Sequence, residues 1–137
     1  MTKHAYIRAY MAGIFTPALF LIVIMAAYCA IRYIYNLPIP IERVIVFPMA
    51  VVPNLWGLWN ILYVAFFAQR HLSLGLYGGA LPLLLAPCGY GIARLLHFPI
   101  PDVIYGVFPI AFPIGVALYY LAWKYIVGFL NAELGIA

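Results

Sequence analysis

The amino-acid sequence predicts an all-α integral membrane protein, a four-helix transmembrane bundle built from a tandem, parallel duplication of a two-helix hairpin. Three observations lead to this class. The 137-residue chain is 69% hydrophobic and only 7% charged, whereas an ordinary soluble domain carries roughly 25% charged residues. The few charges delimit four long apolar runs, and the second half of the chain repeats part of the first.

Each of the four charge-free runs is long enough to cross a bilayer. The runs cover 9–31, 44–69, 71–93 and 103–123, which are 23, 26, 23 and 21 residues. A helix needs ~20 apolar residues to cross a ~30 Å hydrocarbon core. Lipid offers no partners to backbone N–H and C=O groups, and no alternation of period two is visible, so helices are expected instead of barrel strands. The whole chain, 1–137, is expected to form one transmembrane domain.

The cationic side chains give the expected orientation. With four spans both termini share one side of the membrane, and that side carries slightly more Lys and Arg than the other. The positive-inside rule therefore favours cytoplasmic termini, and a bacterial-type inner membrane is the expected location. The termini side holds Lys3, Arg8, Arg70 and Lys124, and the opposite side holds Arg32, Arg43 and Arg94.

The internal repeat has a period of about 61 residues. Seven of the thirteen aligned positions of 38–50 and 99–111 are identical, and three of these identities are prolines. We place repeat one at about 10–69 and repeat two at about 72–130. Each repeat contains two spans, so both enter the membrane in the same sense and a pseudo-twofold axis along the membrane normal is expected.

Two pairs of prolines lie inside the second and fourth runs: Pro48 and Pro53, and Pro109 and Pro113. Proline lacks a backbone N–H and crowds the carbonyl four residues back, so both helices are expected to be broken. In lipid the freed carbonyls need partners from neighbouring helices, water or a ligand. Corresponding interrupted helices in two halves point to a binding site in transporters, and a purely structural kink is the alternative.

Four polar or aromatic residues at membrane depth are candidates for ligand or pore contacts: Asn54, Trp56, Asn60 and Tyr119. Trp prefers the membrane interface, yet Trp56 lies near the predicted bilayer centre, so it is expected to face protein or a cavity. An Asn amide at this depth can hydrogen-bond across helices for ~0.6–2 kcal/mol. Such interhelical bonding is the favoured role for the two asparagines, and a ligand contact is the alternative.

The third run has a helix-packing face. Gly75 and Gly79 form a GxxxG pattern, and small residues let helix backbones approach closely. The sequence leaves open whether this face meets another helix of the same chain or a second subunit.

No catalytic constellation is visible, and neither a metal site nor a cofactor is expected from the two cysteines and three histidines. The low charge argues against nucleic-acid binding. The expected function is therefore non-catalytic, as a self-assembling scaffold or a small accessory subunit of a membrane complex, with the bilayer and a homo-oligomer or complex subunit as partners. The alternative is a small channel or carrier with its site near the broken second and fourth helices. A dry aromatic core would favour the first function, and a water-filled crevice at Asn54 and Asn60 the second.

Overall fold

The computed structural model describes residues 3–38 and 40–136, and these residues form helices and turns with no strand. Four helical stretches in this part of the chain are long and apolar enough to cross a membrane. This confirms the expected all-helical class with four apolar helices. The stretches are Ala5–Tyr35, Ile41–Arg70, Leu74–Leu95 and Asp102–Glu133.

Only the first stretch is one uninterrupted α-helix, α1 (Ala5–Tyr35). The second comprises α2 (Ile41–Val44), the π-helical η1 (Ile45–Ala50), α3 (Val51–Leu62), the π-helical η2 (Tyr63–Phe67) and the 3₁₀-helical η3 (Ala68–Arg70). The third comprises α4 (Leu74–Gly79) and α5 (Leu81–Leu95). The fourth comprises α6 (Asp102–Leu121), the π-helical η4 (Ala122–Val127) and α7 (Gly128–Glu133).

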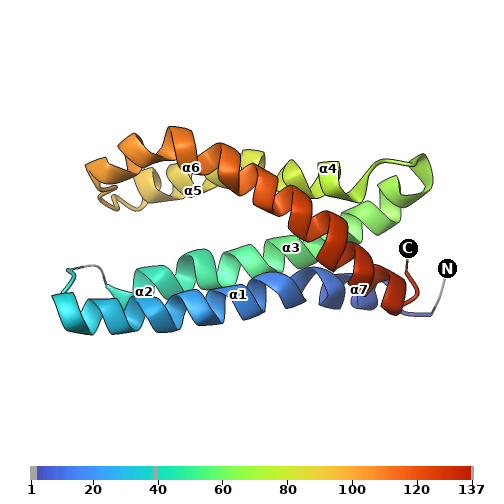
Figure 1. The fold of residues 1–137 in the computed structure, drawn as a ribbon, viewed down its shortest axis with the longest axis horizontal. Helices are drawn as coiled ribbons and strands as arrows, with labels where there is room; N and C mark the ends of the chain where they lie inside the picture. Colours follow the sequence, from blue (N-terminus) through green and yellow to red (C-terminus); the bar gives the residue numbers. More distant parts are fainter. Residues whose placement is uncertain (1–2, 39, 137) are drawn as a thin grey trace.

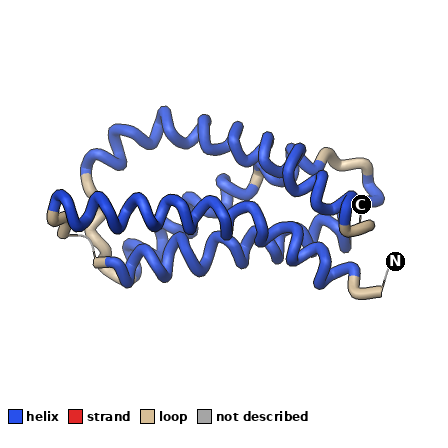
Figure 2. The backbone as a smooth tube through the Cα atoms, turned by 60° about the horizontal axis from the view of Figure 1, so that its bottom comes forward, coloured by secondary structure: helices blue, strands red, loops and turns tan. Residues whose placement is uncertain are grey.

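The helices form two antiparallel hairpins that cross each other (Figure 1). In the first hairpin α1 lies beside α3, and in the second α4 and α5 lie beside α6. Both termini lie at the end where the hairpins cross, as the turned view also shows (Figure 2). There the Arg8 side chain donates a hydrogen bond to the backbone oxygen of Leu134, at 3.3 Å. Away from this end the two hairpins diverge.

The close approach of α1 to α3 depends on glycine. A Cβ atom at Gly13 would lie 2.9 Å from the Cα of Gly57 and 2.5 Å from the backbone oxygen of Trp56. No larger residue fits between the two backbones without moving them. This is the use of small residues expected where apolar helices pack without a hydrophobic driving force between them.

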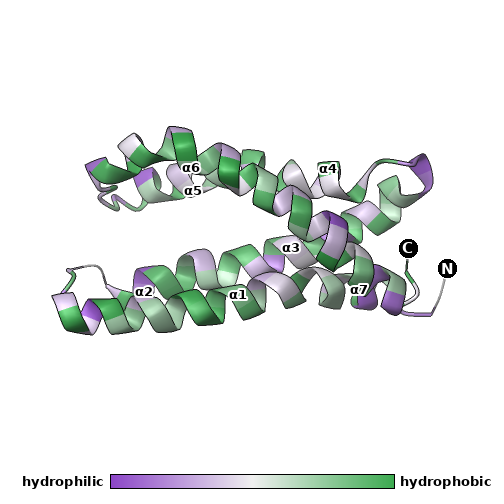
Figure 3. Ribbon diagram, viewed as in Figure 1, coloured by the Kyte–Doolittle hydropathy of each residue, from purple (hydrophilic) through white to green (hydrophobic). Residues whose placement is uncertain are grey.

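The packed interior occupies only the half of the bundle nearest the termini. Every described residue that is buried lies in one of four stretches, 5–21, 52–64, 75–85 and 123–131. The other halves of the helices carry hydrophobic side chains around their circumference, and most hydrophilic segments lie at helix ends (Figure 3). In water such a surface would be exceptional, because exposed apolar patches mark interaction or membrane-facing sites.

One expectation for the fourth span is wrong. The helix α6 stays α-helical through Pro109 and Pro113, so the predicted break of this helix is absent. The helical stretch continues past Lys124 to Glu133. The Lys124 ammonium lies over the rings of Tyr120 and Tyr125, 5.6 and 5.2 Å from their centroids, so the helix accommodates its charge on an exposed face.

The second span does contain an interruption. Phe47, next to Pro48, has non-helical φ and ψ of −138° and 120° inside η1. The Phe47 ring points to the second hairpin, where a Cβ at Gly89 would lie 3.2 Å from the tip of that ring. The corresponding Phe108 instead stacks on Phe112 of its own helix, with ring centroids 5.0 Å apart.

Candidate functional site

A pair of buried amides joins three helices in the packed half. Asn60 of α3 and Asn131 of α7 are 0% and 1% exposed. The Asn60 amide donates to the Asn131 side-chain oxygen and to the backbone oxygen of Ala9, both at 2.8 Å. Asn131 donates back to the Asn60 side-chain oxygen at 3.1 Å. Both donors of Asn60 are thus used within the protein, so a ligand would have to displace one of these contacts.

Aromatic rings surround this pair. Trp56 packs on Tyr119 and Trp123 of the fourth span, with centroid distances of 4.8 and 5.2 Å. Trp59 stacks on Tyr77 at 4.7 Å, and each of these two donates a hydrogen bond to the other's backbone oxygen. The predicted candidates Trp56 and Tyr119 therefore meet each other across the two hairpins. Two indole N–H groups in this cluster, those of Trp56 and Trp123, are buried without a hydrogen-bond partner among the described residues.

Asn54 lies outside this interior. Its side chain is exposed and accepts a hydrogen bond from the Tyr10 hydroxyl of α1. Its amide donates to the backbone oxygen of Ala50, one turn earlier, at 2.6 Å. Asn54 and Asn60 thus make separate contacts, the first on the surface between α1 and α3 and the second in the core.

The four candidate prolines have different environments. Pro53 is buried in the packed half, and Pro48 is half-buried beside the interruption at Phe47. Pro109 and Pro113 lie on exposed positions of α6. The prolines therefore do not share the equivalent surroundings that a pair of matching broken helices would create.

The predicted packing glycines face a helix of the same chain. A Cβ at Gly75 would lie 2.8 Å from the Tyr120 ring, and one at Gly79 would lie 3.5 Å from the Tyr120 Cβ. Gly78, between them, lies directly against the Trp123 side chain. This face brings α4 against the fourth span.

The sequence did not predict the exposure of the diverging half of the second hairpin. We call this half, residues 86–115, the α5–α6 arm. Within it every residue from 101 to 111 is exposed, with Ile110 69% and Val103 65% exposed. Among the described residues, a Cβ added at Gly106 or Gly115 would meet nothing within 4 Å. Hydropathy alone could not reveal this surface, since both halves of these helices are rich in apolar residues.

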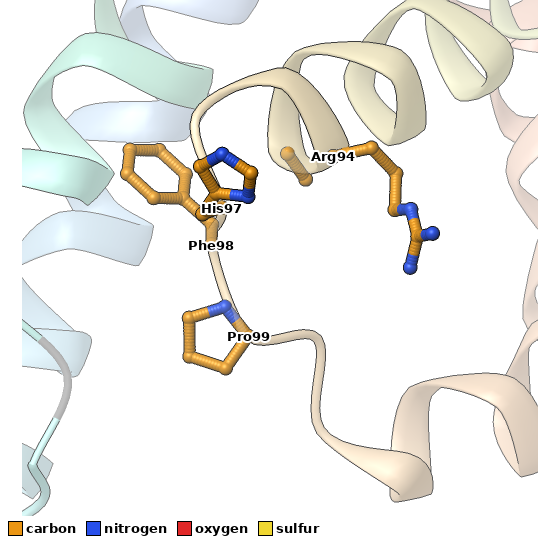
Figure 4. A pocket seen from close by; sticks show the side chains of 5 residues that line it. Arg94, His97, Phe98 and Pro99 are labelled. Atoms are coloured by element: carbon orange, nitrogen blue, oxygen red, sulfur yellow. The ribbon is translucent and has the colours of Figure 1, made fainter.

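A pocket of about 360 Å³ lies at the tip of the arm, at the turn between α5 and α6. Arg94 extends along one side of it, and the rings of His97, Phe98 and Pro99 follow the turn on the other (Figure 4). From the sequence, Arg94 contributed only to the count of cationic residues on the side opposite the termini.

The candidate residues taken from the sequence therefore divide between a closed core and an exposed surface. In the core the amides of Asn60 and Asn131 bond to each other, while Arg94 and His97 are exposed at the tip of the α5–α6 arm. No family model, curated protein or solved structure matches this chain.

Proposed function

We propose that the chain is a non-catalytic integral membrane protein that self-assembles through its α5–α6 arm, as a scaffold or a small subunit of a membrane complex. The four long apolar helices support the membrane location. Hydrophobic side chains around the diverging halves would face lipid or another helix there, where they carry no penalty.

The single observation that carries this proposal is the exposure of α6 on all sides over residues 101–111. Four small residues lie on this helix, Gly106, Ala111, Gly115 and Ala117, and Ala111 and Gly115 are four apart on one face. In membranes such small residues allow close helix contacts. Most homo-oligomers are symmetric about a twofold axis that uses one patch twice. A second copy of the chain is therefore the proposed occupant.

The closed core favours assembly over permeation. A channel or carrier at the predicted candidates would need free polar groups at Asn60 or at matching breaks in the second and fourth helices. The Asn60 amide donates both of its hydrogen bonds, to Ala9 and Asn131, and α6 is continuous through its prolines. A core packed with aromatic rings supports the scaffold function.

A tandem duplication is part of the proposal. Repeats 10–69 and 72–130 would each contribute one hairpin, related by a pseudo-twofold axis along the membrane normal. The π-helical segments Tyr63–Phe67 and Ala122–Val127 support this, because they begin about 60 residues apart near the same end of the bundle. The open helix faces of the second repeat would then reflect divergence after duplication.

Membrane insertion predicts that the two ends of the bundle are labelled from opposite sides. Cys29 and Cys88 are first replaced by alanine, and Ser73→Cys or Asn36→Cys is added, both at exposed positions. An impermeant thiol reagent on intact cells is expected to label Asn36→Cys at once and Ser73→Cys only after permeabilisation, since the termini end is proposed to be cytoplasmic. Labelling of both from one side would contradict the four-span topology.

Self-association predicts a disulfide-linked dimer from a single cysteine on the arm. In the background without native cysteines, Ala111→Cys is expected to cross-link to a second copy on mild oxidation in membranes, because a twofold axis brings identical positions together. Adding Gly115→Leu on the same face is expected to reduce the dimer at least about fivefold. The matched control is Val23→Cys, an equally apolar position of α1 that is 70% exposed.

The cross-linking results show whether a second copy, another protein or no specific partner contacts the arm. Equal cross-linking of Val23→Cys and Ala111→Cys would mean random collision and would contradict the specific interface. A cross-link from Ala111→Cys to a different protein would mean that another subunit, and not a second copy of this chain, occupies the arm.

A further inference from the structure

We propose that the pocket at the tip of the α5–α6 arm binds the phosphate group of an acidic phospholipid, with Arg94 as its principal ligand and His97 as a second donor. The phospholipid depends on the proposed membrane location, although it does not depend on self-association. Nothing in the proposed assembly uses these two side chains.

Two hydrogen bonds hold the backbone of the turn that carries Arg94 and His97. The Phe98 N–H donates to the Ala93 oxygen at 2.8 Å, and the His97 N–H donates to the Arg94 oxygen at 3.2 Å. His97 has a φ of 54°, so these bonds form a Schellman ending of α5 with His97 in the left-handed position. Two carbonyls that would repel an anion at the end of the helix are thereby bonded to N–H groups.

The basic side chains at this turn are available to a ligand. Arg94 and His97 are both exposed, and within residues 3–38 and 40–136 neither side chain makes a hydrogen bond or an ion pair. The nearby carboxylate of Asp102, on the first turn of α6, does not pair with them in this part of the chain. A helix-ending Arg often bonds the last carbonyls, but here the backbone already does so.

A further guanidinium comes from the first hairpin. The Arg43 guanidinium stacks over the Phe98 ring, 4.4 Å from its centroid. Phe98 lines the pocket, and its contact with Arg43 leaves the guanidinium charge unneutralised. Arg43 therefore adds positive charge at the Phe98 side of the turn that carries Arg94 and His97.

The surroundings match a lipid better than a soluble anion. Arg94 comes one residue before the end of the apolar stretch Leu74–Leu95, which would place it at the depth of the lipid phosphates. Leu95 and Leu96 beside it are 78% and 51% exposed, and the apolar arm continues from there for acyl chains to lie against. An Arg guanidinium forms charge-assisted, often bidentate hydrogen bonds with a phosphate group.

The test counts phospholipid retained by the purified full-length chain. Protein from phosphatidylcholine vesicles containing phosphatidylglycerol is extracted into mild detergent, and bound lipid is measured by native mass spectrometry. Wild type is expected to retain phosphatidylglycerol in preference to phosphatidylcholine. Arg94→Gln is expected to bind phosphatidylglycerol at least about fivefold more weakly, because this is the usual contribution of one Arg near an acidic membrane surface. His97→Asn removes the imidazole but tolerates the left-handed backbone, and it is expected to weaken binding less.

Arg70→Gln is the matched control, because Arg70 is equally exposed but lies at the opposite end of the bundle. Retention by Arg94→Gln equal to wild type, or equal loss in Arg70→Gln, would overturn the site. Displacement of phosphatidylglycerol by millimolar inorganic phosphate would assign the pocket to free phosphate and overturn the lipid. Two-sided labelling of the same variants verifies insertion, so a failed membrane location is distinguished from a failed site.

Discussion

Replacing Gly78 with alanine is expected to destabilise the protein by about 3 kcal/mol, the upper part of the usual range for overpacking. The added Cβ would overlap the Cβ and Cγ atoms of Trp123. These are the first atoms of that side chain, so rotating its tip cannot relieve the overlap. Trp123 is 0% exposed and packs on Trp56 and Tyr77, so it has no free space into which to move.

The measurement is thermal unfolding of the detergent-solubilised protein beside a matched control. Gly91→Ala adds the same methyl group to α5, where a Cβ meets nothing within 4 Å. That control is expected to unfold at the wild-type temperature or slightly above, because alanine is the better helix former. Equal melting temperatures for the two variants would contradict the packing of α4 against Trp123.

The four apolar helices were predictable because charge is rare in this chain and marks where each run stops. Asn131 was not among the candidate residues, because it lies beyond Lys124, where the charge-free run stops. In the structure the helix continues past this lysine to Glu133, and Asn131 forms half of the buried amide pair.

A local motif was not sufficient to predict which of the two proline-containing helices is interrupted. The same Val-Phe-Pro tripeptide occurs at 46–48 and 107–109, but only the first contains a non-helical residue. The two phenylalanines differ in their contacts, since the Phe47 ring lies against α5 at Gly89, whereas Phe108 stacks within its own helix. A sequence pattern identical in both repeats carries no information about these contacts.

For candidate residues in the middle of a span, burial was predicted only from their distance to the ends of the apolar run. A Trp and an Asn far from both ends of an apolar run are expected to face protein, and Trp56 and Asn60 are buried. Asn54 lies in the same run, but it is on the outer surface with Tyr10. The helical positions of Asn54 and Asn60 differ by six residues, which places them on different faces.

Replacing Asn60 with leucine is expected to cost about 1–2 kcal/mol, because the buried Asn131 amide and the Ala9 oxygen then lose their partner. Asn131→Leu is expected to cost a similar amount. The double variant removes both amides together, so its loss is expected to be about 1 kcal/mol smaller than the sum of the single losses. Unfolding of wild type, both single variants and the double variant completes the cycle.

Asn54→Leu is the control for this cycle, since its side chain is exposed and does not contact the pair. The amides join α1 and α3 to α7, whereas the α5–α6 arm contains no buried residue. Loss of the pair is therefore expected to loosen the crossing of the hairpins while cross-linking through Ala111→Cys persists in the folded fraction. Strictly additive losses of stability in the cycle would contradict the reciprocal bond between Asn60 and Asn131. Loss of cross-linking in folded Asn60→Leu would mean that the arm is not an independent docking surface.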